Sequence, residues 1–163
     1  MAKINFTIED LKISCANLKS KNKFSLGFDK MTPDAAEIWL SLNGDKLCNQ
    51  LNGSKYNVMP AVGFNVAKTA GGYRRLAKLT AIDTIIQGAT LEKISPVCEE
   101  IFSDTSYAYR KGKGTGTALK KFCEYATDFQ YAAKINQKSC FDSIDFDILE
   151  KAISLTPVLI LTR

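Results

Sequence analysis

At 163 residues the chain has room for one domain, or one domain and part of another, and its 45% hydrophobic content can form a core. The net charge of +5 is mildly basic, and it favours a polyanionic partner only where the basic residues cluster. The absence of histidine excludes catalytic triads built on that residue, and five cysteines without CxxC spacing argue against a zinc site and a disulfide framework.

The first third of the chain is predicted to be helical. Apolar residues over 6–20 recur at helical spacing. The run Thr32-Pro33-Asp34 is typical of a helix start, because threonine caps the first turn and proline fits the first helical position. We expect Asn43-Gly44 to stop that helix, and a second short helix to end at Asn52-Gly53.

A β-hairpin is predicted next, with strands at 58–66 and 73–79 around the turn signal Ala70-Gly71-Gly72. Its tip is basic, with Lys68, Arg74, Arg75 and Lys78. Because glycine allows close approach of the backbone and guanidinium groups grip phosphate oxygens, such a tip can clamp a nucleotide triphosphate or a backbone phosphate. An ordinary solvated hairpin is an equal alternative.

Helices are expected at 81–91 and 92–101, with a kink near Pro96, and again at 117–129 and 143–153. A basic, glycine-rich loop precedes the third of these helices. Its aromatic and basic residues are Tyr107, Tyr109, Arg110, Lys111 and Lys113. Aromatic rings beside cations suit base stacking with phosphate pairing, whereas the alternative is a loop whose tyrosines pack inward.

A central strand is predicted at 131–135. It ends in the polar run Asn136-Gln137-Lys138-Ser139, with Phe141 and Asp142 close behind. A carboxylate at a strand end is the usual holder of a catalytic divalent metal. Here the strand ends in the neutral amide of Asn136, which is a poorer magnesium ligand. Asp142 instead stands at the start of the following helix, where it suits the helix dipole.

Five blocks stand in a characteristic order. Residues 27–32 read GFDKMT, 51–60 read LNGSKYNVMP, and 68–76 read KTAGGYRRL. A helix that contains Asp83 follows, and then residues 102–112 read FSDTSYAYRKG. This order resembles the amino-terminal part of a bacterial reverse transcriptase, an RNA-directed DNA polymerase, of the group II intron maturase-like class.

The resemblance implies an α/β (α+β) fold. Mostly helical fingers with the basic β-hairpin would occupy 1–129, and the first strand and helix of the palm would occupy 130–163. It also implies the partners of the parent enzyme, which are an RNA template, an RNA/DNA hybrid and an incoming deoxynucleotide. We see no signal peptide and no membrane-spanning stretch, and therefore expect a cytoplasmic protein without a membrane partner.

Roles carry over position by position. The residues that the resemblance assigns to the incoming nucleotide are Lys68, Arg74, Arg75 and Gln137. Those that it assigns to the RNA template path are Arg110, Lys111 and Lys113. Phe141 would be the aromatic residue that blocks a ribose 2′-hydroxyl.

Two departures bear on activity. Asn136 stands where the family has a metal-binding aspartate, and no YxDD motif occurs before Arg163. Magnesium therefore belongs to the parent enzyme, and we expect this chain to bind none and not to polymerise DNA. Either it is an excised piece of the enzyme, which could self-associate through exposed apolar surface, or it is a degenerate copy. The alternative function is a non-catalytic RNA-binding module.

Overall fold

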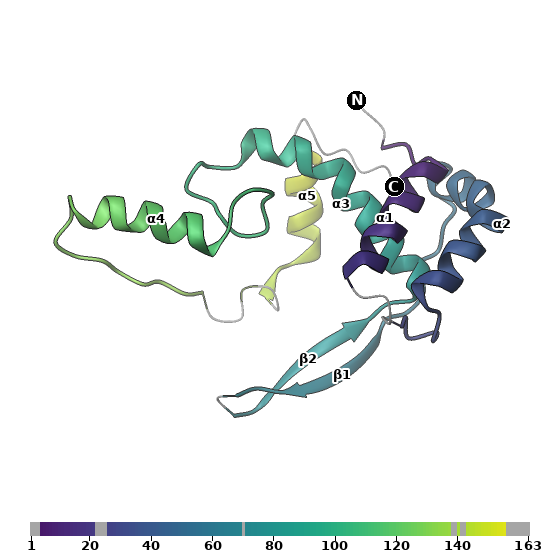
Figure 1. Ribbon diagram of the computed structural model, residues 1–163, viewed down its shortest axis with the longest axis horizontal. Coiled ribbons are helices and arrows are strands. Elements are labelled where there is room, and N and C mark those ends of the chain that lie inside the picture. The colour runs from purple at the N-terminus through teal and green to yellow at the C-terminus, as the bar shows by residue number, and fades with distance from the viewer. Residues whose placement is uncertain (1–3, 22–25, 70, 138–139, 141–142, 156–163) are drawn as a thin grey trace. The chain divides into compact units, whose positions relative to one another are not determined.

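The computed structural model describes residues 4–21, 26–69, 71–137, 140 and 143–155. Within these ranges the fold is mixed α and β, as predicted (Figure 1). Its elements are α1 (Ile8–Lys21), α2 (Pro33–Asn52), β1 (Val62–Ala67), β2 (Tyr73–Lys78), α3 (Ala81–Ile101), α4 (Thr115–Ala126) and α5 (Phe146–Leu155). None of the described helices combines the length and apolar content that crossing a membrane requires.

The described residues form two compact units. The first ends at Ile94 and the second begins at Ser95, so the division falls inside α3. The predicted division between fingers and palm at residues 129 and 130 stays a prediction.

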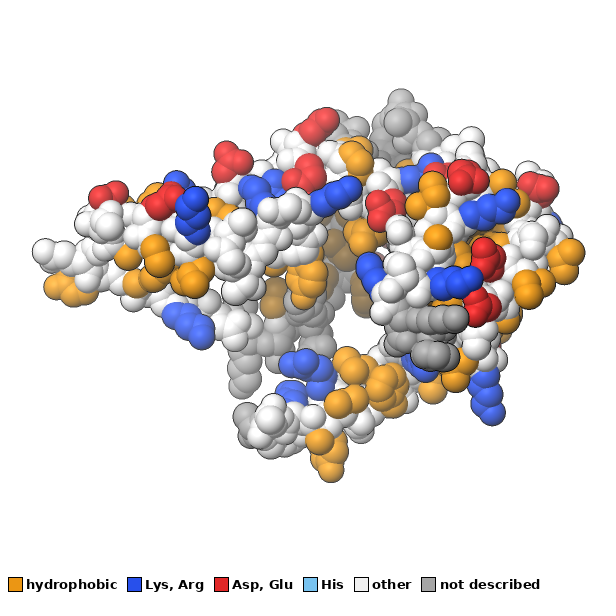
Figure 2. All heavy atoms as spheres, in the orientation of Figure 1, with side chains coloured by type: hydrophobic (Ala, Val, Ile, Leu, Met, Phe, Trp, Pro, Cys, Tyr) orange, Lys and Arg blue, Asp and Glu red, His pale blue; other side chains and the backbone are white. Residues whose placement is uncertain are grey.

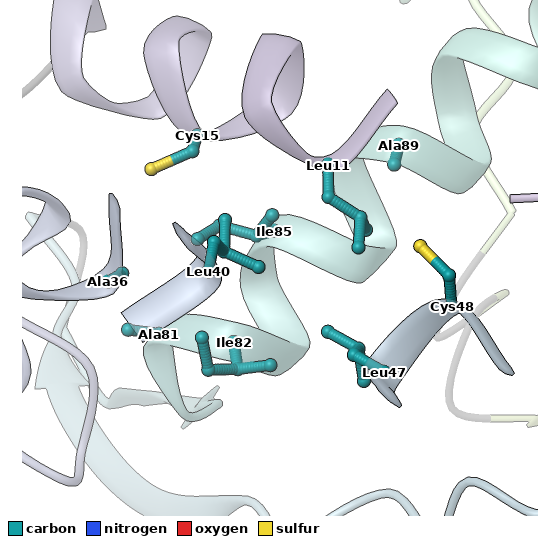
Figure 3. Packing of buried hydrophobic residues seen from close by; sticks show 10 residues of the cluster. All are labelled: Leu11, Cys15, Ala36, Leu40, Leu47, Cys48, Ala81, Ile82, Ile85 and Ala89. Carbon is teal, nitrogen blue, oxygen red and sulfur yellow. The ribbon is translucent and has the colours of Figure 1, made fainter. Parts of the chain in front are cut away.

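The core of the first unit lies between α1, α2 and α3 (Figure 3). Each helix turns apolar residues spaced by three or four positions toward the other two, which is the pattern of a helix with one buried face. The buried residues are Leu11, Cys15, Ala36, Leu40, Leu47, Cys48, Ala81, Ile82, Ile85 and Ala89. Burial raises the pKa of the thiols of Cys15 and Cys48, so they stay protonated and act as small apolar groups.

The predicted helix break at Asn43-Gly44 is wrong, because α2 runs unbroken through it. The helix α3 continues through Pro96, as predicted, and the kink there stays a prediction. Gly44 is buried, and a Cβ there would lie only 2.7 Å from Cδ1 of Ile8 in α1. Glycine costs about 1 kcal/mol in a helix, but here it allows Ile8 to pack closely against α2. Tertiary packing therefore outweighs the local turn signal.

The predicted palm strand at 131–135 is also wrong. Residues 131–137 have no regular secondary structure, and the side chains of Tyr131 and Ile135 are exposed. A strand requires a hydrogen-bonded neighbour, and in the described part of the chain the two strands present pair with each other. A β-prone composition cannot supply the missing partner.

The start of α1 is held by a reciprocal cap. The Thr7 backbone N–H donates to Asp10 Oδ2 at 2.7 Å, and the Asp10 N–H donates to Thr7 Oγ1 at 3.3 Å. Lys93 Nζ from α3 lies 2.9 Å from the same carboxylate oxygen. Burial of Asp10 raises its pKa, but the bonds from Lys93 and Thr7 together outweigh burial and lower it.

An Asp10→Asn variant should lower the free energy of unfolding of the first unit by about 1 kcal/mol near neutral pH, because it loses the ion pair to Lys93. The pKa of Asp10 is depressed in the folded chain below the ordinary aspartate value of 3.8. The contribution of the ion pair is therefore fully present above pH 3.8 and is lost as the pH falls below that value. Chemical denaturation of variant and parent at neutral and acid pH measures the difference. Glu9→Gln, an exposed neighbour, is the matched control, and a pH-independent gap between Asp10→Asn and the parent would contradict the ion-pair explanation.

Candidate nucleic-acid interface

The base of the hairpin is fixed where β2 passes into α3. Asp83 is 4% exposed, and its carboxylate accepts hydrogen bonds from the hydroxyls of Thr80 and of Tyr56, the latter at 2.8 Å. Burial and the bond to Asp83 raise the pKa of Tyr56 above its usual value, so the phenol remains a donor. A buried carboxylate with two hydroxyl donors thus fixes the first turn of α3 against the segment before β1.

The segment at 26–32 packs against the same junction. The Phe28 N–H donates to the Leu79 carbonyl at 3.0 Å, and the Asp29 carboxylate accepts from the Ala81 N–H at 3.4 Å. A Cβ at Gly27 would overlap the backbone nitrogen of Ala81, so only glycine permits this approach. The motif residues Gly27, Asp29 and Asp83 therefore hold the base of the hairpin, which determines the direction of its tip.

The hairpin turn follows the prediction. The Lys68 N–H donates to the Gly72 carbonyl at 2.9 Å, and the Gly71 N–H donates to the Lys68 carbonyl at 3.0 Å. Gly71 and Gly72 have φ of 89° and 79°, a region that disfavours residues with a side chain. The turn signal read from the sequence is thus realised in its backbone.

The strand register gives the hairpin two different faces, because residues opposite each other in an antiparallel pair lie on the same side. Phe64 pairs with Leu76, and Val66 pairs with Arg74. We call this side the apolar–basic face, which consists of Val62, Phe64, Val66, Arg74, Leu76 and Lys78. The opposite side, the polar face, consists of Gly63, Asn65, Ala67, Tyr73, Arg75 and Ala77.

A shallow depression of about 370 Å³ lies at the tip, lined by Val66, Ala67, Lys68, Thr69, Arg74 and Leu76. Lys68 in the turn and Arg74 in β2 thus contribute two cations to one hollow. Basic and hydrophobic side chains lie side by side on the hairpin in Figure 2, and the sequence has no Asp or Glu from 46 to 82. The arrangement can bind phosphate, because a lysine and an arginine line one hollow together with apolar residues, and no carboxylate lines it.

Arg75 lies on the polar face and does not line this depression. Its Nε and Nη2 are 3.5 and 3.7 Å from the point where a Cβ of Gly63 would stand. The guanidinium therefore lies over the glycine of the neighbouring strand. Of the hairpin cations assigned to the nucleotide, the structure brings together Lys68 and Arg74 and separates Arg75 from them.

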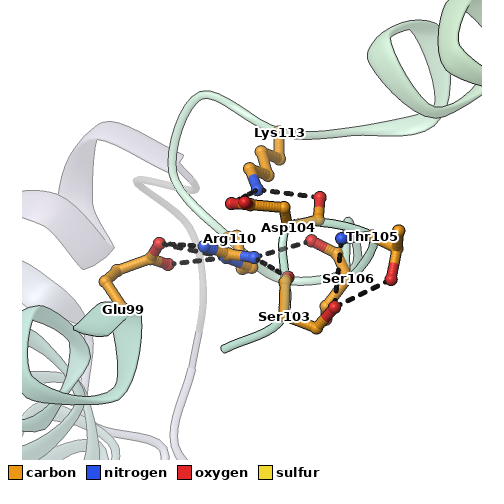
Figure 4. A network of polar contacts seen from close by, with 7 residues as sticks. All are labelled: Glu99, Ser103, Asp104, Thr105, Ser106, Arg110 and Lys113. Carbon is orange, nitrogen blue, oxygen red and sulfur yellow. Dashed lines mark hydrogen bonds and ion pairs between the residues drawn. The ribbon is translucent and has the colours of Figure 1, made fainter. Parts of the chain in front are cut away.

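Arg110 holds the loop after α3 together (Figure 4). Its Nε lies 3.1 and 3.0 Å from the two carboxylate oxygens of Glu99, and its Nη1 donates to the carbonyls of Ser103 and Ser106 at 2.7 and 2.9 Å. The bonds between the two side chains lower the pKa of Glu99 and raise that of Arg110. The Arg110 side chain is 5% exposed and stands over the Phe102 ring. In this geometry Arg110 is engaged within the loop, and its assigned role on the RNA template path stays a prediction.

The other loop cations differ from each other. Lys113 donates to the Asp104 carbonyl at 3.1 Å and lies 5.5 Å from the centre of the Tyr107 ring. Lys111 is exposed, as is Tyr109. Tyr107 is therefore partly buried and Tyr109 faces outward, while stacking of either ring on a base stays a prediction.

Asn136 and Gln137 are exposed and lie in the stretch without regular structure, and Phe141 lies outside the described residues. Their assigned roles stay predictions. In the described ranges, no three or more Cys, Asp or Glu side chains come close enough together to hold a metal ion.

The sequence did not single out Glu99 or Gly63. Glu99 has Glu100 beside it, and nothing in the sequence tells which carboxylate faces Arg110, since that depends on the rotation of α3. Gly63 had a usable signal, because a glycine inside a predicted strand often marks the close approach of another group.

No protein-family model matches the chain. Curated proteins similar to it include the COX1/OXI3 intron 2 protein of Saccharomyces cerevisiae, 26% identical over 148 residues, which are 90% of this chain and 17% of that protein. A 91 kDa protein in a cob intron of Schizosaccharomyces pombe is 26% identical over 110 residues, which are 68% of this chain and 14% of that protein. Protein YkfC of Escherichia coli is 25% identical over 141 residues, which cover 83% of this chain and 37% of YkfC. Two of these three relatives are thus intron proteins by name. The chain spans less than two fifths of the length of each of the three.

Proposed function

We propose that this chain is an RNA-binding amino-terminal part of a reverse transcriptase of the group II intron class, in which the hairpin tip also takes the triphosphate of an incoming deoxynucleotide. The order of the motifs supports the class, and the similarity to intron proteins supports an RNA partner. The observation that carries the proposal is the shared depression of Lys68 and Arg74.

The charges favour a polyphosphate over a neutral ligand. The stretch from 46 to 82 has six basic and no acidic residues, and four of the six lie on the hairpin, so the hairpin's field attracts anions. Arg74 supplies planar, forked donors and Lys68 a compact charge, which together suit the oxygens of neighbouring phosphates. Val66 and Leu76 form the apolar part of the depression, on which a ribose or base can rest.

The described residues do not fit a magnesium ion. Asn136 offers a neutral amide where the resemblance has a carboxylate, and the described ranges contain no acidic cluster of the size that a metal requires. We therefore assign no chemical step to this chain. The same amide favours a second candidate function, a non-catalytic RNA-binding module.

Alanine at Lys68 or at Arg74 should weaken binding of a labelled deoxynucleoside triphosphate by about tenfold, because each removes a charge-assisted contact. Arg75→Ala is the matched control, since it removes an equal charge from the adjacent residue on the other face of the strand, and it should have a smaller effect. Fluorescence anisotropy of the labelled nucleotide, without metal, measures the affinities. Equal losses of affinity in Arg74→Ala and Arg75→Ala would show that net charge alone acts. That result would contradict binding of the triphosphate in the depression lined by Arg74.

The same titrations separate the two candidate functions. A chain that binds RNA but no triphosphate would favour the non-catalytic module. In both cases RNA affinity should fall as salt concentration rises, because phosphate contacts release counterions. A chain that binds neither RNA nor triphosphate at low salt would refute the proposal.

A further inference from the structure

The loop at 103–113 has two cations that are engaged inside it. Arg110 is bound to Glu99 and to two backbone carbonyls, and Lys113 is bound to the Asp104 carbonyl and lies over the Tyr107 ring (Figure 4). The Lys113 backbone N–H also donates to the Arg110 carbonyl at 3.2 Å. Side chains and backbone thus fix the loop from both of its ends.

Two other residues of the loop face outward. Tyr109 is 104% exposed, and Lys111 is exposed beside it. Neither has a hydrogen bond, ion pair or ring contact with another residue in the described part of the chain, in contrast to Tyr107 and Lys113. A tyrosine without internal contacts contributes nothing to packing, so folding does not explain its presence there.

The backbone of Tyr109 adds a second observation. Its φ is 59°, in the left-handed region that a bulky residue rarely adopts. A glycine would meet this requirement without strain, yet the chain has a large aromatic ring there. Strained residues cluster at functional sites, so an exposed aromatic residue with this backbone is a candidate for contact with a ligand.

We propose that Tyr109 is a stacking platform for an unpaired RNA base, with Lys111 contacting a neighbouring phosphate, so that the loop selects single-stranded over double-stranded RNA. This inference rests on the proposed RNA-binding function and adds the class of RNA. Every base has a face that can stack on a tyrosine ring, but in a duplex those faces are covered by the neighbouring base pairs. The ring therefore discriminates by base pairing and not by sequence.

The test compares Tyr109→Gly with the parent in the full chain. Binding of a labelled single-stranded RNA of about 12 nucleotides should weaken about 5- to 150-fold, the range measured for the loss of one base–aromatic stack. Binding of the same sequence in a fully paired duplex should change less than about twofold, since no base is free to stack. Thermal stability should be equal to or above that of the parent, because glycine relieves the strain at φ of 59°.

Two further variants complete the experiment. Tyr131→Gly is the matched control, because it removes a 91% exposed tyrosine ring outside the loop, and it should leave both affinities unchanged. Tyr109→Trp should retain affinity for the single strand, and its added fluorescence should be quenched by that RNA and not by the duplex.

The outcomes separate the inference from the proposed function. If the parent binds single-stranded RNA and Tyr109→Gly binds it equally well, the inference is wrong and the proposed function stands. The inference would also be overturned if Tyr109→Gly lost the same affinity for single-stranded and duplex RNA. It would likewise be overturned if both losses came with a fall in thermal stability, because the ring would then support the fold and not bind a base. If the parent binds neither RNA, both are wrong.

Discussion

An alanine at position 40 should lower the free energy of unfolding of the first unit by about 2–5 kcal/mol. Leu40 is fully buried, and Figure 3 shows its side chain between those of α1 and α3. Truncation leaves a cavity that Leu11 and Ile85 cannot close without moving their helices. Because the core consists of few residues, a large part of its stability depends on this one side chain.

Leu42→Ala is the matched control for that variant. Leu42 is on the same helix but 80% exposed, so its removal should change the free energy by less than about 0.5 kcal/mol. Trp39, the single tryptophan, packs against the core cluster, and its fluorescence during denaturation reports on the first unit. Similar losses in the two variants would mean that the three helices do not form this core.

Gly27→Ala should destabilise the first unit by about 1–3 kcal/mol, the usual cost of inserting a methyl group where no space exists. The new Cβ would overlap the Ala81 nitrogen and lie 3.0 Å from the Thr80 carbonyl carbon, and backbone atoms cannot rotate away. The segment at 26–32 must then move from the junction of β2 and α3. Since that junction holds the hairpin, affinity for a triphosphate should fall as well.

Gly116→Ala serves as the control for the glycine change. Among the described residues no heavy atom comes within 4 Å of a Cβ built there, and the residue lies in the first turn of α4. Alanine should therefore be neutral or stabilising by up to about 1 kcal/mol. Denaturation curves and nucleotide titrations of both variants test the contrast. If Gly27→Ala kept the parent's stability and triphosphate affinity, the segment at 26–32 would not pack closely on α3.

The sequence predicted correctly those helix starts and turns that depend on neighbouring residues in the chain. Thr32 caps α2 by accepting a hydrogen bond from the Ala35 N–H at 3.1 Å, and Gly71 and Gly72 form the hairpin turn. The failures depend on distant residues. Whether Gly44 ends a helix was decided by Ile8, and whether 131–135 forms a strand was decided by the lack of a paired neighbour in the described ranges.

The candidate interface was predictable to a similar extent. The motif at 68–76 drew attention to Lys68 and Arg74, but only the strand register separates Arg74 from Arg75. Composition marked the loop at 103–113 as basic and aromatic without saying which side chains it uses for its own structure. That depended on the carboxylate of Glu99, which is brought to Arg110 by the geometry of α3.

The alternation of faces along β2 makes the length of the hairpin turn as important as its charge. An insertion or deletion between Lys68 and Tyr73 that shifted the pairing by one residue would exchange Arg74 and Arg75 between the faces. It would also turn Leu76 away from Phe64, while leaving composition and net charge almost unaltered. Homologous hairpins should therefore vary in the identity of their tip residues more readily than in the number of residues between the two strands.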